Sequence, residues 1–305
     1  MKPAIVVHGG THTLDAAHAQ EYKAGCAQAA QHGWCVLQAG GTALDAVEAA
    51  LRVLESNPLF NAGYGAQLNM VGMAELDAVL MEGAQLRSAS VVSLRRVRHP
   101  ITLAHKALLC DPPERTAQVS GHRAASLARQ YGLELCDSGG LICEPQRQRW
   151  MRSRAPTPRY DAVGCVALDS EGHLAAGVSS GGAHRHLPGH RCESTLVESS
   201  LYVDDRLGAC LLLGNTAQSA HIALAREAVE LLASASHPDA AAVWAVQTLE
   251  ERAGIEGGCV LLDARGRFGW AHHTPHMVCA HQRAEMNRSL AFINKVECQS
   301  SAECR

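Results

Sequence analysis

The sequence predicts an α/β protein arranged as a four-layer αββα sandwich. Short β-branched runs end at glycine-rich turns, amphipathic helical segments lie between them, and this pattern recurs in both halves of the chain. The chain has 305 residues, of which 47% are hydrophobic and 19% charged, so it can bury a sizeable core. We expect a single domain over residues 1–295 and a flexible tail over residues 296–305.

The first half should begin with a buried strand over residues 3–7, because this apolar run stops at Gly9. Apolar residues at helical spacing predict helices over residues 21–38 and 43–55, and Thr42 is placed to cap the second helix. The other elements expected in this half are a hairpin over residues 75–81 and 90–94 and helices over residues 101–109 and 121–131.

A basic segment separates the two halves. Residues 144–161 contain several arginines, Pro156 and Pro158, with little periodicity, and this composition is typical of an exposed linker. The second half should hold strands over residues 163–168, 174–178 and 209–213, helices over 222–232 and 240–252, and a hairpin over 258–262 and 267–272.

The composition limits which partners the protein is expected to bind and in which compartment it is expected to lie. A net charge of −3 argues against a nucleic-acid or anionic-membrane partner. No window approaches the roughly 18 apolar residues of a membrane span, and the first apolar run is too short for a signal peptide. The twelve cysteines form no CxxC pair, and the histidines show no metal-binding spacing. We therefore expect a cytoplasmic protein with reduced cysteines.

Several motifs resemble one known family. The stretches Val6-Val7-His8-Gly9-Gly10, Glu75-Leu76-Asp77-Ala78 and Asp161-Ala162-Val163-Gly164 are similar to signatures of the isoaspartyl peptidase/L-asparaginase (plant-type) and taspase family of N-terminal-nucleophile hydrolases. The resemblance covers nearly the whole chain. It implies the αββα fold of these hydrolases, with residues 1–161 matching their α subunit and residues 162–295 their β subunit. It also implies a homodimer, or a heterodimer with an active paralogue.

The resemblance places the family's catalytic threonine at position 162, where this chain has Ala162. In the family, the chain cuts itself before that threonine, and the freed amine and hydroxyl act as base and nucleophile. Alanine has no hydroxyl and cannot make the shift that cuts the chain. The single residue therefore removes both catalytic groups.

Other positions of the family's substrate pocket also differ. His190 stands where an arginine binds the substrate carboxylate, and Arg191 is one place away. Leu213 replaces a threonine that contacts the oxyanion. The positions that keep a family-like residue are Ser180, Glu193, Gly214 and Asn69. These differences favour a pseudoenzyme that does not process itself, or a protein repurposed to bind a small molecule or peptide with a β-aspartyl-like group.

Two hydrolytic alternatives remain open. The site could be rebuilt around Ser180 or Cys165, with His184, His186 or His190 as the base, and act on asparagine or β-aspartyl peptides. Cys165 lies three residues after position 162, so along a strand it should point to the opposite face, and Ser180 could instead satisfy a backbone group at the following turn. The second alternative is an engineered threonine-to-alanine form of an active hydrolase.

The resemblance also implies a structural sodium ion and no other cofactor. The segment from residue 54 to residue 65 is similar to the family's sodium-binding loop, in which backbone carbonyl groups hold the cation. The corresponding positions here are Leu54, Glu55, Asn57, Phe60 and Ala62. A weaker interpretation is an α/β protein that binds phosphate at His8-Gly9-Gly10 or at Ser180-Gly181-Gly182. Neither of these glycine pairs belongs to a known phosphate-binding loop.

Overall fold

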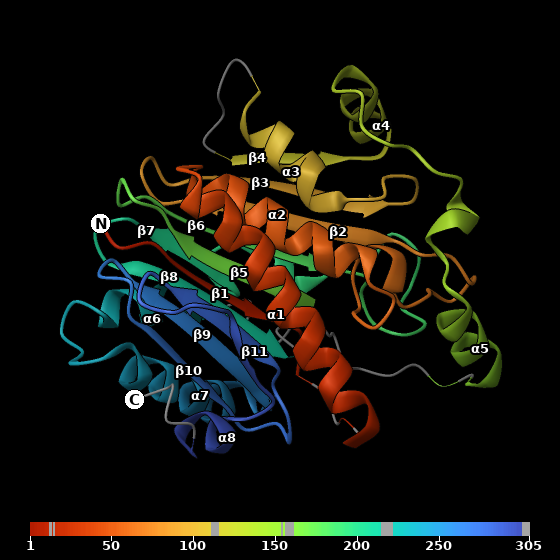
Figure 1. The fold of residues 1–305 in the computed structure, drawn as a ribbon. Helices are drawn as coiled ribbons and strands as arrows, with labels where there is room; N and C mark the ends of the chain where they lie inside the picture. The colour runs from red at the N-terminus through yellow and green to blue at the C-terminus, as the bar shows by residue number, and fades with distance from the viewer. Residues whose placement is uncertain are drawn as a thin grey trace.

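The computed structural model describes residues 1–300 except residues 12, 13, 15, 111–115, 154, 156–161 and 215–221. Two β-sheets face each other, and helices cover the outer face of each sheet (Figure 1). The predicted four-layer αββα sandwich is confirmed.

The larger sheet has eight strands. In spatial order they are β12 (Leu290–Phe292), β11 (Cys279–Arg283), β1 (Ala4–His8), β5 (Ala162–Leu168), β6 (Leu174–Ser180), β2 (Leu76–Glu82), β3 (Arg87–Leu94) and β4 (Thr116–Ser120). Neighbouring strands are antiparallel apart from β3 and β4, which are parallel. Strands from the two halves of the chain alternate in blocks across this sheet.

The smaller sheet has four antiparallel strands. Their order is β10 (Phe268–His272), β9 (Gly257–Asp263), β8 (Gly208–Gly214) and β7 (Leu201–Asp204). Its inner face contacts β5 and β6 of the larger sheet. The two central strands of the second half therefore lie in the middle of the molecule.

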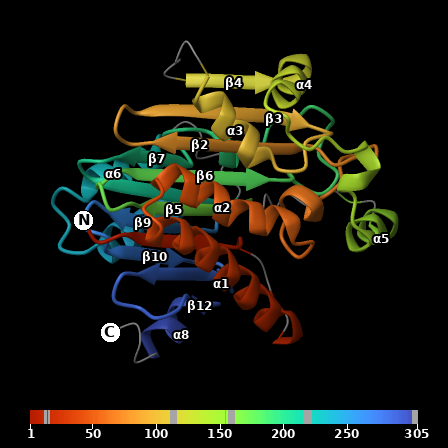
Figure 2. The same ribbon diagram turned by 45° about the horizontal axis from the view of Figure 1, so that its top comes forward.

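Helices of the described chain cover the outer face of each sheet, with α4 (Gly121–Gln130) lying near β3 and β4 at the edge of the larger one. On the larger sheet lie α1 (Ala16–Gln38), α2 (Ala43–Ser56) and α3 (Pro100–Leu108), and on the smaller sheet lie α6 (Leu224–Leu231) and α7 (Pro238–Ala253). The turned view shows α1 and α2 crossing the face of the larger sheet (Figure 2). The capping box predicted at α2 is present, because the Thr42 side chain and the Asp45 carboxylate each accept the other's backbone N–H.

Two apolar cores result from this layering, and β5 contributes to both. Val163, Cys165 and Ala167 face the helices of the first layer. Ala162, Val166 and Leu168 face the smaller sheet. This alternation follows from the two-residue period of a strand.

The predicted linker is wrong in its first part, because residues 144–152 form a helix, α5 (Glu144–Arg152). Proline occupies its first turn, and side-chain hydrogen bonds join Gln148 to Glu144 and Arg152 to Gln148, each four residues apart. None of its residues is fully buried, which explains why its periodicity is weak. Figures 1 and 2 both show α5 standing at the margin of the fold. Residues 156–161 of the predicted linker lie outside the described part of the chain.

The predicted flexible tail begins with a short helix, α8 (Lys295–Ser300). Cys298 in this helix is buried and disulfide-bonded, so the prediction that all cysteines are reduced is wrong for this residue. The other described cysteines are free. Strands β4, β7, β11 and β12 were also absent from the predicted elements. Among the described residues, no helix is both long and apolar enough to cross a membrane.

Candidate functional site

Ala162 is the first residue of β5 and lies at the meeting point of three strands. It pairs with Ser180, the last residue of β6, and Ser180 pairs on its other side with Asp77 of β2. The Ala162 side chain is 8% exposed and belongs to the core between the sheets, as does Leu213 of β8. Two of the three altered family positions therefore lie in the core between the sheets, and Ala162, Ser180, Asp77 and Leu213 are called the Ala162 cluster below.

Ser180 is buried, and its hydroxyl is occupied. Its Oγ accepts a hydrogen bond from the Gly182 backbone N–H at 3.1 Å and one from the Cys192 thiol at 3.2 Å. The first contact is the backbone role proposed for this serine as the alternative to catalysis. Cys192, which the sequence analysis did not single out, thus lies against the centre of the site.

The three histidines proposed as bases make their observed hydrogen bonds with other groups. His184 contacts the Ser153 carbonyl, His186 the Ala183 carbonyl, and His190 the Glu193 carboxylate. None of these contacts involves the Ser180 hydroxyl. In the described structure, a serine–histidine pair at Ser180 is not formed.

Cys165 lies on the other face of β5, as the strand period predicts. It is fully buried against the helices of the first layer. Burial raises the pKa of its thiol, because a thiolate is unfavourable in apolar surroundings. Cys165 is therefore poorly placed to act as a nucleophile in the Ala162 cluster.

Asp77 anchors the segment that carries the substrate-binding positions. Its carboxylate accepts the Ser93 backbone N–H at 2.6 Å and also the Cys192 backbone N–H. Burial raises the pKa of Asp77 to about 6, although these hydrogen bonds and the positive charge of Arg191 favour the ionised form. Asp77 therefore joins β3 and the segment around residue 192 directly beneath Ser180.

Glu75 fixes the same segment from a second point. Its Oε1 accepts two hydrogen bonds from Arg95, at 2.9 and 2.7 Å, and its Oε2 accepts the Gly189 backbone N–H at 2.9 Å. Burial opposes ionisation, but hydrogen bonds from Asn69, Gly189 and Arg95 outweigh it and lower the pKa of Glu75. The two carboxylates, two residues apart, hold the loop that contains His190.

Asn69 has a structural role in the described fold. Its Nδ2 donates to Glu75 Oε2 at 3.1 Å, and its Oδ1 accepts the backbone N–H groups of Val71 and Met73, both at 3.0 Å. The side chain is fully buried. These contacts order the turn before β2 and engage both ends of the Asn69 amide.

His190 and Arg191, which were expected to bind substrate, make contacts within their own segment of the chain. His190 Nε2 lies 3.1 Å from Glu193 Oε1, and Arg191 donates to the Thr195 carbonyl at 2.9 Å. Burial lowers the pKa of Arg191, while Asp77 opposes that effect. Gly214 at the end of β8 has a φ of +120°, a conformation that favours glycine.

The expected sodium loop follows α2, and its glycines pack closely against its backbone carbonyl groups. A Cβ atom on Gly63 would lie 2.2 Å from the Glu55 carbonyl oxygen, and one on Gly65 would lie 2.1 Å from the Phe60 carbonyl oxygen. The carbonyl groups of Leu54, Asn57 and Ala62 accept backbone hydrogen bonds within the loop. A hard cation prefers oxygen ligands, and a carbonyl has a second lone pair, so the loop fits a sodium ion.

The Glu55 carboxylate contacts groups of the neighbouring strand and helix. It accepts the Ser179 hydroxyl at 2.7 Å and the Ile101 backbone N–H at 3.0 Å, and it lies 3.2 Å from His99 Nδ1. Burial raises the pKa of Glu55, although these contacts favour the charged form. Glu55 therefore links α2, α3 and β6 beside the site.

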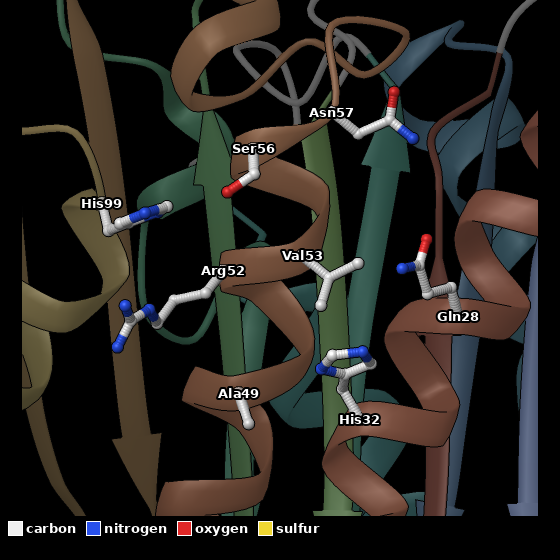
Figure 3. A pocket seen from close by; sticks show the side chains of 8 residues that line it. All are labelled: Gln28, His32, Ala49, Arg52, Val53, Ser56, Asn57 and His99. Atoms are coloured by element: carbon white, nitrogen blue, oxygen red, sulfur yellow. The ribbon is translucent and has the colours of Figure 1, made fainter.

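A surface depression of about 540 Å³ lies over α1 and α2. Figure 3 shows Arg52 and His99 on one side of α2, whereas His32 and Gln28 come from α1. None of the residues lining it belongs to the Ala162 cluster. Within the described chain, no group of three or more histidine, cysteine, aspartate or glutamate side chains could hold a metal ion.

The sequence analysis recognised the Glu75–Asp77 motif but assigned neither carboxylate a role. Two acidic residues separated by one position lie on the same face of a strand, and that spacing was the available signal. Nothing local to Cys192 indicated its contact with Ser180, which is twelve residues away in the sequence.

The fold and the strand ends around Ala162 define a sandwich with its candidate site at the start of a central strand. A family model described as "Asparaginase" matches residues 1–291. The chain therefore belongs to the asparaginase family, and its αββα sandwich is that of the N-terminal-nucleophile hydrolases.

Relatives with a name align with most of the chain. It is 33% identical over 281 residues to an isoaspartyl peptidase/L-asparaginase of Xenopus laevis, covering 87% of each chain. It is 31% identical over 278 residues to the protein of the same name in Danio rerio, covering 88% of each. It is 31% identical over 315 residues to a plant-type L-asparaginase of Pyrococcus abyssi, covering 95% of this chain and 99% of that one.

Proposed function

We propose that this member of the asparaginase family does not cut itself and does not hydrolyse amides, and that it binds a ligand at the segment that carries His190 and Arg191. The observation that carries the proposal is Ala162 at the start of β5, paired with Ser180. The family chemistry needs a hydroxyl nucleophile, and an amine freed by cleavage, at that position. A methyl group supplies neither of them.

The surroundings of Ala162 support the same conclusion. Leu213 presents a buried apolar side chain where an oxyanion contact would be needed. The Ser180 hydroxyl is held by Gly182 and Cys192, and burial raises the pKa of the Cys192 thiol to about 12. A neutral thiol is a weak nucleophile, so Cys192 does not replace the missing threonine.

The proposed ligand is a small molecule or peptide with a β-aspartyl-like group. Arg191 supplies a half-buried positive charge, and His190 is 38% exposed beside the Glu193 carboxylate. A ligand carboxylate and a ligand amine would match these opposite charges. We also propose a sodium ion in the loop between Glu55 and Gly65, where it would hold the carbonyl groups and stabilise the turn beside the site.

The test is the intact mass of the purified protein under denaturing conditions. We expect one chain near 32 kDa, before and after incubation with β-aspartyl dipeptides, and no release of aspartate from L-asparagine. Two fragments separated before Ala162 would overturn the claim that the chain is not processed. Hydrolysis that disappears in Ser180→Ala would support a rebuilt site instead.

Restoring the nucleophile separates natural loss from an engineered change. We expect Ala162→Thr alone to remain uncut and inactive, because Leu213 and His190 still differ from the family pattern. The triple variant Ala162→Thr, His190→Arg and Leu213→Thr is the matched comparison. Cleavage and activity in the single variant would show that only the alanine blocks an otherwise competent site.

A further inference from the structure

A second pocket lies at the β4 edge of the larger sheet, apart from Ala162. It has a volume of about 540 Å³ and is enclosed by the end of β3, by β4 and by α4 (Gly121–Gln130). Gly189 closes its fourth side. This volume is in the range typical of small-molecule sites.

The floor of the pocket is apolar. Leu94 and Val97 come from β3 and the segment that follows it, Ala124 comes from α4, and Leu135 comes from the segment after that helix. The first three are buried, and Leu135 is partly buried. A ligand that fills this pocket therefore gains by burying an apolar body.

The charged groups that line the pocket are mostly positive. Arg95, Arg96 and Arg129 line it, against the single carboxylate of Glu75. Arg95 neutralises Glu75, and Arg96 donates to the Cys136 carbonyl at 3.3 Å. The Arg129 guanidinium makes no hydrogen bond or ion pair with any residue that the structure describes. Two positive charges therefore remain without a carboxylate partner at the pocket.

We propose that this pocket binds a small monocarboxylate with an apolar body. The carboxylate would lie between Arg129 on α4 and Arg96 after β3, because a guanidinium binds a carboxylate through two parallel hydrogen bonds. The apolar body would lie on Leu94 and Val97. Ala162, Ser180, Asp77 and Leu213 do not line this pocket, although Glu75 and Gly189, which do, also hold the loop that contains His190.

The test is calorimetric titration of the full chain at low ionic strength with 3-phenylpropionate, 3-phenylpropan-1-ol and inorganic phosphate. We expect saturable binding of the carboxylate, and binding of the alcohol that is weaker by roughly tenfold or more. Phosphate should also bind more weakly, because it has no apolar body. Equal binding of acid and alcohol, or tighter binding of phosphate, would overturn the proposal.

Two arginines of α4 provide a matched pair of variants. Arg129→Gln should weaken binding of 3-phenylpropionate by roughly tenfold. Arg123→Gln removes the same charge from the same helix, but Arg123 is exposed and does not line the pocket, so binding should be unchanged. If the two variants weakened binding equally, the net charge of the protein would explain the binding, and the proposed site would be contradicted. A change of oligomeric state in Arg129→Gln, measured by light scattering, would indicate a subunit contact and also overturn the proposal.

Discussion

At the scale of single residues, Asp77 couples the stability of the fold to pH. Its pKa is raised from 3.8 to about 6 in the folded protein, so the folded state binds a proton more readily than the unfolded state. The stabilising effect of protonated Asp77 is complete below pH 3.8 and is lost as the pH rises through 6. A difference of roughly two pH units corresponds to about 3 kcal/mol.

The measurement compares wild type with Asp77→Asn in urea unfolding between pH 4 and pH 7. We expect the difference in unfolding free energy between the two proteins to change by up to about 3 kcal/mol over this range, in favour of the variant at higher pH. The comparison cancels the contributions of groups that do not interact with Asp77, and His186 and Arg191, whose charges act on Asp77, are part of the measured difference. A difference that does not vary with pH would show that Asp77 is not the titrating group.

Gly63 is a second residue whose environment can be tested directly. A Cβ atom there would approach the Glu55 carbonyl oxygen at 2.2 Å, and the residue has a φ of +52°. Gly40 has a φ of +80° with open space around it and is the matched control. We expect Gly40→Ala to cost about 1 kcal/mol of unfolding free energy and Gly63→Ala at least twice as much. Equal losses in thermal or urea unfolding would contradict the crowded loop.

Residue roles could be predicted where they depend on local sequence or on the family pattern. The Thr42 cap and the placement of Cys165 opposite Ala162 belong to this group. The partners of Asp77 and Glu75 could not be predicted, because they include backbone N–H groups of residues more than one hundred positions away. Only the folded register of β2 beside β6 brings these groups together.

At the scale of elements, α5 is attached to the fold mainly through Trp150. The indole N–H donates to the Asn69 carbonyl at 2.9 Å, and the Arg185 guanidinium lies 4.5 Å from the ring centre. Arg185 also donates to the Trp150 carbonyl at 2.6 Å. The helix is therefore held at one side chain and by one arginine from the loop after β6.

We predict that Trp150→Ala releases α5, so that the backbone around its already exposed arginines unfolds more readily and trypsin cuts it faster. Cleavage within residues 144–153 should become about tenfold faster, since the lost contacts would be worth roughly 1–2 kcal/mol. Met151→Ala changes the neighbouring residue, which is 60% exposed, and should leave the rate unchanged. Mass spectrometry of a digestion time course measures both rates. Equal rates in the two variants would contradict the docking role of Trp150.

Helices and strands were predicted correctly where their buried residues recur at a regular spacing of apolar side chains. They were missed where that spacing is absent. Helices α2 and α7 and strands β5 and β6 were recognised, because their buried faces are apolar. Strand β11 contains His281 and Gln282, both buried, and these polar residues masked a strand that lies inside the sheet between β12 and β1. Helix α5 has no fully buried residue, and its stability comes from side-chain pairs and the Trp150 contact.

At the scale of the whole molecule, the two cores share β1 and β5 and should unfold together. Leu51 lies in the core beneath the helices, and Leu211 lies in the core between the sheets. Each is fully buried, so Leu51→Ala and Leu211→Ala should each cost about 2–5 kcal/mol of unfolding free energy. Urea transitions followed by tryptophan fluorescence and far-ultraviolet circular dichroism should coincide in both variants. Separate transitions would show that the layers are independent units.

The sandwich as a whole could be predicted from the sequence because layer architecture follows from the order of elements and their apolar faces. The order of strands within the larger sheet could not. That order depends on pairings between residues such as Val6 and His281, which are far apart in the chain and carry no local signal.

The strand order has a consequence for the lifetime of the folded chain. From β11 to β2, strands of the second and first halves interleave, so the halves meet along the β11–β1, β1–β5 and β6–β2 borders. A protease cut between residues 153 and 162 would sever the backbone, yet the two pieces would stay hydrogen-bonded along three borders. Nicked protein would then keep its native mass and shape in size-exclusion chromatography, and turnover of the molecule would require unfolding after the cut.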